Sequence, residues 1–67
     1  MYHASVLKKL RQESGLTQQQ VAKCLRVDHS TYADYEAGNT EPDREQLIDL
    51  ACLFGVSLSE LTDEPLH

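Results

Sequence analysis

The sequence predicts a compact all-α domain of five short helices, organised as a single unit over residues 1–67. Three observations support this fold class. Apolar residues recur at three- and four-residue spacing, as they do on one face of a helix. Side chains that cap helix starts, and glycines that end helices, separate these stretches. A chain of this length also buries only about 60% of its unfolded surface, which suits one small core.

The first expected helix covers about residues 4–14. Leu7 and Leu10 stand three residues apart, so both side chains lie on one face and point towards the core. The pair Ser14–Gly15 ends this helix, because glycine readily adopts the left-handed conformation that closes a helix.

The middle of the chain predicts two short helices joined by a tight corner. Thr17 can accept a hydrogen bond from a first-turn amide and Gln20 completes a capping box, so we expect a helix over about 18–25. Asp28 offers a second N-cap, for a helix over about 29–36. Two helices joined by so short a turn cross steeply and leave the second one protruding. This is the geometry of a helix-turn-helix.

A loop rich in helix-breaking residues precedes the last two expected helices. The segment AGNTEPD combines glycine, asparagine and proline. A helix over about 43–54 follows and ends at Gly55. A short helix over about 58–63 begins after Ser57, with Glu60 at its third position. The last residues, DEPLH, are expected to fray.

The sequence lacks the features of a membrane, secreted or catalytic protein. No apolar run approaches the roughly 20 residues of a membrane span, and the first residues lack the apolar region of a signal peptide. A cytoplasmic location is therefore expected. No nucleophile–base pair, carboxylate pair or phosphate-binding glycine loop is present, so we expect a binding module rather than an enzyme. The three histidines are His3, His29 and His67. None has a carboxylate or thiol at a metal-ligand spacing, so we expect no bound metal and no cofactor.

Cys24 and Cys52 are too few for a disulfide framework and have no metal-binding spacing. Each flanks the apolar stripe of an expected helix, which is typical of small, partly buried thiols in a reducing compartment. The alternative is a redox-sensing Cys24 activated by the nearby cations Lys23 and Arg26.

Over about residues 3–63 the chain resembles the Cro/repressor-type, or XRE, helix-turn-helix family. LKKLRQESGLTQQQVAKCL matches the first two helices of that family, STYADYEAGNTEP its recognition helix and following loop, and LIDLACLFGVSLSEL its last two helices. The apolar positions of the motif also match: Val21, Ala22, Leu25, Val27, Tyr32 and Tyr35. Arg26 departs from the pattern, because this corner usually holds glycine in a left-handed conformation that costs other residues roughly 1–2 kcal/mol.

The resemblance implies a sequence-specific transcriptional regulator, most simply a repressor, that binds double-stranded DNA as a homodimer. The helix over 29–36 would lie in the major groove, with half-sites roughly 34 Å apart. His29 would donate to guanine N7 or O6 or to a phosphate, and a solvated residue at a helix start is the alternative for it. Four residues would face the base edges: His29, Ser30, Ala33 and Asp34.

The resemblance also implies phosphate contacts from four polar residues: Gln18, Arg26, Asn39 and Thr40. Gln18 is otherwise a surface helix former, and Arg26 a solvated loop residue. Asn39 is otherwise a turn residue that tolerates a positive φ.

Two further sets of residues follow from the resemblance. Arg11 and Glu36 match positions that form a buried ion pair in some relatives, which would fix the recognition helix. A dimer surface would form at the last helix and neighbouring parts of the helix over 43–54, around Leu58, Leu61 and Leu66, with core packing as the alternative for the first two.

The charge distribution favours a second hypothesis. The net charge is −5. Residues 1–26 hold five Lys or Arg against one acid, a local +4, whereas residues 27–67 hold one Arg against ten acids, a local −9. DNA affinity depends largely on neutralised phosphates, so an acidic chain binds DNA at a disadvantage. The alternative function is an acidic protein-interaction module that binds a partner protein or antagonises a DNA-binding relative. If Asp28 caps a helix, it would repel DNA less, because the first backbone amides of that helix would donate hydrogen bonds to its carboxylate.

Overall fold

The computed structural model describes residues 2–62 as four α-helices followed by one 3-10 turn. The prediction of an all-α domain is confirmed at this level, but the count of five helices is wrong. The last expected helix is only the turn η1. In chain order the elements are α1 (Ala4–Glu13), α2 (Gln18–Leu25), α3 (His29–Ala37), α4 (Arg44–Phe54) and η1 (Leu58–Glu60).

The backbone after η1 pairs with the start of the chain instead of continuing a helix. The His3 amide donates to the Leu61 carbonyl at 2.9 Å, and Tyr2 and Thr62 form an isolated antiparallel bridge. Because these carbonyls and amides are used between segments, they are not available for a further helical turn.

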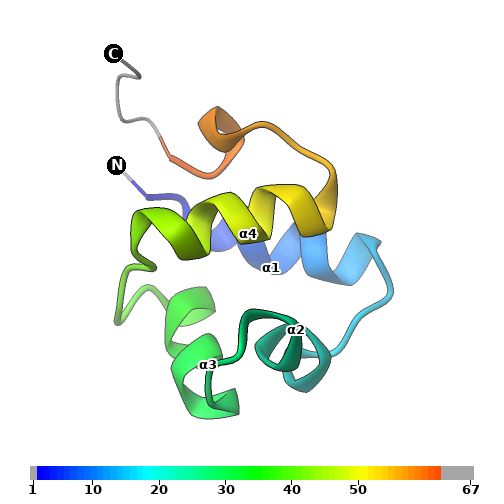
Figure 1. Ribbon diagram of the computed structural model, residues 1–67, viewed down its shortest axis with the longest axis vertical. Helices are drawn as coiled ribbons and strands as arrows, with labels where there is room; N and C mark the ends of the chain where they lie inside the picture. Colours follow the sequence, from blue (N-terminus) through cyan, green and yellow to red (C-terminus); the bar gives the residue numbers. More distant parts are fainter. Residues whose placement is uncertain (1, 63–67) are drawn as a thin grey trace.

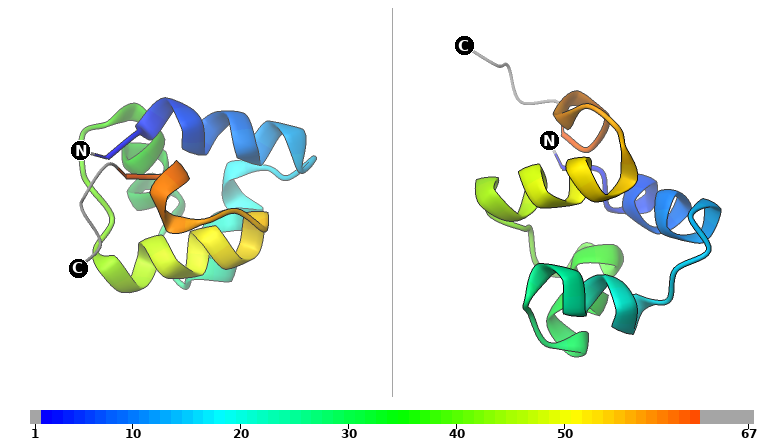
Figure 2. Two further views of the ribbon diagram at one scale, coloured as in Figure 1. Left: turned by 90° about the horizontal axis from the view of Figure 1, so that it is seen from above. Right: turned by 45° about the vertical axis from the view of Figure 1, so that its right-hand side comes forward.

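The helices form two halves. α1 and α4 make one half and α2 and α3 the other (Figure 1). Seen from above, η1 lies between α1 and α4, and the right-hand view shows α3 at the end of the molecule away from η1 (Figure 2). α2 and α3 pack closely on each other, and α3 also packs on α1. The helix-turn-helix thus stands out from the rest of the domain, with its second helix held on two sides.

All the described helices contribute to one core. Tyr32 and Leu7 are fully buried, and the Tyr32 ring meets the Tyr35 ring edge to face, with centroids 6.2 Å apart. The Tyr2 hydroxyl donates to the Tyr35 carbonyl at 3.0 Å, which ties the start of the chain to α3. The buried apolar residues are Leu7, Val21, Ala22, Leu25, Tyr32, Tyr35, Leu47, Leu50, Ala51 and Leu61.

The predicted capping box at the start of α2 is confirmed. The Thr17 amide donates to Gln20 Oε1 at 2.8 Å, and the Gln20 amide donates to the Thr17 hydroxyl at 3.1 Å. The second predicted cap is wrong in one respect. Asp28 occupies the N-cap position of α3, but its side chain makes no capping hydrogen bond. Its charge is therefore not used by the amides of α3, and it adds to the acidity of this region.

The corner between α2 and α3 has the left-handed conformation that the resemblance implies. Arg26 has φ 60° and ψ 39°, and among residues 2–62 it is the only non-glycine residue with a positive φ. The Val27 amide donates to the Ala22 carbonyl at 3.0 Å, which closes α2. The Arg26 side chain is exposed, so the strain comes from the backbone and not from packing.

Replacing Arg26 with glycine is expected to stabilise the domain by up to about 1 kcal/mol. The change removes roughly 1–2 kcal/mol of strain from the left-handed residue of the folded chain. Part of this gain is lost, because glycine raises the backbone entropy of the unfolded chain. Urea denaturation measures the difference. The control is Arg26→Ala, which keeps the strain and should give no gain. Equal stability of the two variants would show that the corner is not strained.

Candidate functional site

The outer face of α3 carries the four residues predicted to meet base edges. They stand at positions i, i+1, i+4 and i+5 of one helix, so they share one side of it, while Tyr32 on the same helix is buried. His29 and Ser30 are exposed, whereas Ala33 and Asp34 are half-buried. A flat ligand would therefore meet the first turn of α3 before it meets the second.

A buried carboxylate fixes α3 on the other helices. Arg11 donates to Glu36 through Nε (2.5 Å to Oε2) and Nη2 (3.3 Å to Oε1). The remaining guanidinium nitrogen, Nη1, donates to the Leu16 carbonyl at 2.9 Å. The side chains of Arg11 and Glu36 are 13% and 3% exposed. The structure thus contains the ion pair that the resemblance implies, and it joins α1 to α3.

The environment of Glu36 favours its charged form. Burial raises the pKa of this carboxyl, but the combined effect of Arg11, the adjacent Tyr32 hydroxyl and Gln18 is larger and holds the pKa below its ordinary value. For Tyr32 itself, burial comes first and the neighbouring Glu36 adds to it, so the pKa of this phenol is raised well above its ordinary value. At neutral pH the site therefore holds an anionic Glu36 and a neutral Tyr32.

Gln18 belongs to this network and does not project freely towards solvent. Its amide nitrogen Nε2 donates to Glu36 Oε1 at 3.0 Å, and its oxygen Oε1 lies 3.3 Å from His29 Nε2. The sequence places Gln18 among phosphate contacts, yet the structure uses its side chain inside the protein. Sequence spacing could not reveal these contacts, because Glu36 is 18 residues away.

The other predicted phosphate contacts have exposed side chains: Arg26, Asn39 and Thr40. The backbone amides of Asn39 and Thr40 donate to the Asp34 carbonyl at 3.0 and 3.4 Å and so close the end of α3. Gly38 supplies the left-handed residue there, with φ 79°, and Asn39 does not have a positive φ. The alternative role of Asn39 as a left-handed turn residue is therefore not the one observed.

The predicted dimer surface needs correction. Leu61 is fully buried and Leu58 is half-buried against the core, because η1 folds back between α1 and α4. Leu66 lies outside the described residues. Among the described residues, the exposed large apolar side chains lie on α4, the neighbouring helix that the predicted surface also includes: Ile48 at 43% and Leu53 at 36%.

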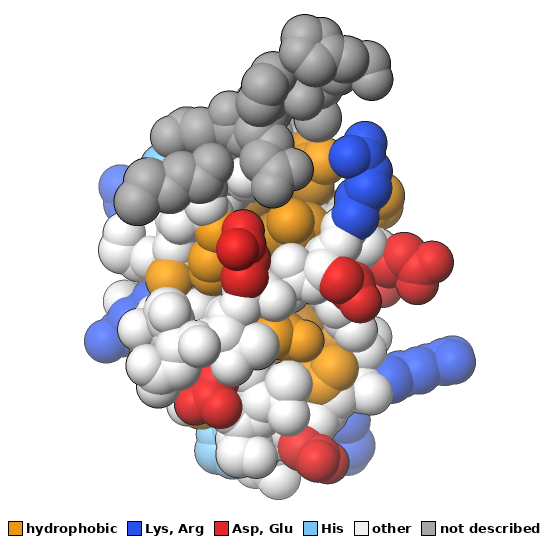
Figure 3. Space-filling view, turned by 90° about the vertical axis from the view of Figure 1, so that its left-hand side faces the viewer, with side chains coloured by type: hydrophobic (Ala, Val, Ile, Leu, Met, Phe, Trp, Pro, Cys, Tyr) orange, Lys and Arg blue, Asp and Glu red, His pale blue; other side chains and the backbone are white. Residues whose placement is uncertain are grey.

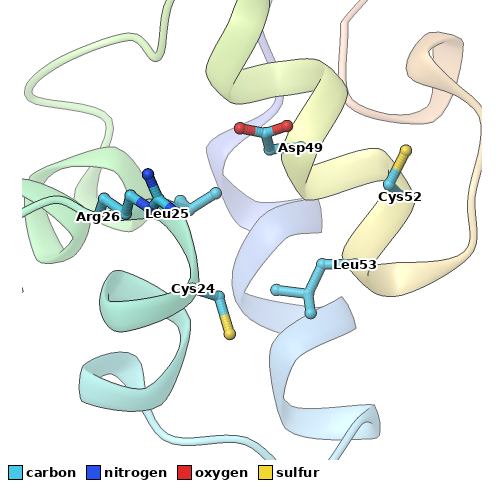
Figure 4. Close-up of a pocket in the computed structure, with 6 residues that line it drawn as sticks. All are labelled: Cys24, Leu25, Arg26, Asp49, Cys52 and Leu53. Atoms are coloured by element: carbon cyan, nitrogen blue, oxygen red, sulfur yellow. The ribbon is translucent and has the colours of Figure 1, made fainter.

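A shallow pocket between α2 and α4 contains both cysteines. Cys24 and Cys52 are both exposed, so the expectation of partly buried thiols is wrong. Figure 4 shows them on different helices, with their sulfur atoms pointing in different directions. Among the described residues no three His, Cys, Asp or Glu side chains are placed to bind a metal ion. The pocket lining is Cys24, Leu25, Arg26, Asp49, Cys52 and Leu53.

Acidic side chains are spread over the face that carries α3 and the loop to α4, and the basic side chains lie mostly at its margins (Figure 3). This distribution agrees with the local −9 of residues 27–67. No described helix is long and apolar enough to cross a membrane.

Replacing Glu36 with glutamine is expected to destabilise the domain at pH 7 by about 3 kcal/mol, because Arg11 is left without its buried partner. The folded-state pKa of Glu36 is lowered, so its contribution is complete above the ordinary value of 4.5 and is lost as pH falls through the folded value. Urea denaturation at pH 7 and pH 3.5 should therefore show a smaller acid effect in Glu36→Gln than in the original chain. The exposed Glu13→Gln is the control and should change stability by less than about 0.5 kcal/mol. An equal acid effect in both proteins would contradict this role.

Comparison with known proteins places this arrangement in a family. Residues 7–61 match a family model described as helix-turn-helix. The HTH-type transcriptional regulator YqaE of Bacillus subtilis is 42% identical over 55 residues, which are 82% of this chain and 47% of that protein. The cryptic phage CTXphi transcriptional repressor RstR of Vibrio cholerae is 36% identical over 61 residues, 91% of this chain and 55% of that protein.

A solved structure has the same fold. The crystal structure of a transcriptional regulator from Listeria innocua matches with a TM-score of 0.84 and 41% identity, over 96% of this chain and 60% of that one. The chain thus spans about half the length of the curated relatives it matches. With a matching family model over most of its length, the chain belongs to the helix-turn-helix family.

Proposed function

We propose that this chain binds double-stranded DNA and regulates transcription, with α3 in the major groove. The observation that carries the proposal is the exposed first turn of α3, held in one pose by the buried Arg11–Glu36 pair. Family membership and the relatives named as transcriptional regulators support it. RstR is named a repressor, which favours repression here. The same family supports a binding module rather than an enzyme.

The exposure of each side chain on α3 suggests its share in base recognition. His29 and Ser30 are exposed, so they would reach base edges most directly. Ala33 would contact a thymine methyl group, and Asp34 would accept a hydrogen bond from a cytosine amino group. Both are half-buried, so their contacts require close docking of the helix.

Phosphate contacts would come from exposed polar groups on either side of α3. Arg26 lies before the helix, and the side chains of Asn39 and Thr40 follow it. Gln18 is turned towards Glu36, so a contact at the start of α2 would use backbone amides. A homodimer would place two such units on half-sites roughly 34 Å apart. Of the leucines expected at the dimer surface, Leu58 keeps a partly exposed side chain.

The acidic face favours one other function. If the surface in Figure 3 meets a protein instead of DNA, the chain acts as an interaction module that binds a partner or antagonises a DNA-binding relative. The two functions differ in a measurable way, since only the first predicts a preferred duplex sequence.

Selection of bound duplexes from a random pool at a stated salt concentration is the test. We expect one enriched site with two-fold symmetry, and Ser30→Ala and Asp34→Ala should each alter the preference at separate positions. Each correct base contact contributes about 1–3 kcal/mol of discrimination. Ser59→Ala, on η1 and away from α3, is the control and should leave the preference unchanged. If no duplex is retarded at low salt, even near millimolar protein, the DNA-binding proposal is wrong and the interaction module remains.

The salt dependence of binding should be shallow. The chain has six Lys and Arg residues, and one of them, Arg11, is paired with Glu36. With fewer than about four phosphates neutralised per copy, the slope of log K against log salt should be smaller in magnitude than about 4 per copy. Titrations at several salt concentrations measure it. A steeper slope would indicate that Lys or Arg side chains away from α3 and its two flanking loops also contact phosphates.

A further inference from the structure

We propose that Gln18 is a positioning residue that makes His29 a hydrogen-bond acceptor, so that His29 selects a base with an exocyclic amino group, adenine or cytosine, over guanine. The proposal rests on the DNA-binding function proposed above and names the base class read at one position. It differs from the expectation that His29 donates to guanine.

The first step is the orientation of the Gln18 carboxamide. Its nitrogen lies 3.0 Å from Glu36 Oε1 and its oxygen lies on the other side, 3.3 Å from His29 Nε2. Glu36 is anionic and only 3% exposed, and it accepts from Arg11 as well. The opposite orientation would bring the carboxamide oxygen against a buried carboxylate. Because an ionised carboxylate accepts and cannot donate, only the NH₂ group of Gln18 can face Glu36.

The second step is the position of the proton on His29. The carboxamide oxygen of Gln18 is only an acceptor, so the hydrogen bond to His29 requires a proton on Nε2. A neutral imidazole has one N–H, and its other nitrogen, Nδ1, is then an acceptor. Among the described residues no group bonds to Nδ1, and the side chain of His29 is exposed. The nitrogen left for a ligand is therefore the one with a lone pair.

The third step relates this acceptor to the bases. In the major groove adenine presents the N6 amino group and cytosine the N4 amino group, both donors, whereas guanine presents the acceptors N7 and O6. An acceptor on His29 pairs with the first two and meets the lone pairs of the third. The hydrogen bonds run from His29 to Gln18 and from Gln18 to Glu36, and Arg11 donates to Glu36 from the other side. Because the Gln18 amide donates to an anion, its carboxamide oxygen becomes a stronger acceptor for His29.

Gln18→Met removes the amide and keeps the length of the side chain. Glu36 retains Arg11 in this variant, so the fold should persist. His29 Nε2–H is then free to donate to guanine. We expect selection from a random pool at pH 8 to change at one operator position. The original chain should prefer adenine or cytosine there over guanine by about tenfold, the fold-change of a modest base contact, and Gln18→Met should reduce this preference to about twofold or less.

Three further proteins make the test specific. His29→Ala identifies the operator position, because it should lose the preference there and at no other position. Gln19→Met is the matched control, since Gln19 is the exposed neighbour of Gln18 on α2, and it should keep the original preference. Long-range proton–nitrogen NMR on the ¹⁵N-labelled original chain at pH 8 should show the His29 proton on Nε2, bonded in the original chain and exchanging faster with water in Gln18→Met.

The outcomes separate the two proposals. A shift of preference in Gln18→Met but not in Gln19→Met supports the role of Gln18. Selection of guanine at the His29 position, an unchanged preference in Gln18→Met, or a proton on Nδ1 overturns it while the DNA-binding function stands. If the original chain binds no duplex, both proposals are wrong.

Discussion

The fold of the recognition region depends on one constraint, the buried negative charge of Glu36. A carboxylate that is 3% exposed must have partners, because a buried charge without them costs several kcal/mol. Here the partners come from two other helices, Arg11 on α1 and Gln18 at the start of α2. Since both donors must reach the same carboxylate, α3 can take only one pose relative to α1 and α2. Charge compensation, added to apolar packing, thus sets the direction in which α3 presents its outer face.

The same acidic chain has two kinds of carboxylate near α3, with opposite consequences. Glu36 is compensated inside the protein and contributes little to the outer potential. Asp28 makes no capping hydrogen bond and keeps its charge at the exposed start of the helix. Binding of a polyanion to this face must therefore depend on the fit of donors and acceptors more than on net attraction. This favours a sequence-dependent contact over general affinity for nucleic acid.

Local sequence predicts α1 to α4 well because their start and stop signals act over a few residues. Thr17 with Gln20 is one such signal, and Gly55 at the end of α4 is another. Features that depend on distant partners could not be predicted. The pairing of Tyr2 with Thr62 shortens the last helix to η1, and the contact with Glu36 turns Gln18 inward. In each case the deciding partner is at least 18 residues away, and neither spacing nor periodicity contains it.

The strained corner fits the charge pattern of the chain. Between residues 24 and 43, Arg26 is the only Lys or Arg, and it stands directly before the acidic helix α3. Glycine at this position would remove the backbone strain and also the only cation there. The contacts of Gln18 with Glu36 and His29 connect α2 to α3 across the corner, so the geometry of the motif does not depend on a relaxed turn. Because these contacts hold the corner in place, the chain can tolerate an arginine there, which places a positive charge beside the surface that would approach phosphates.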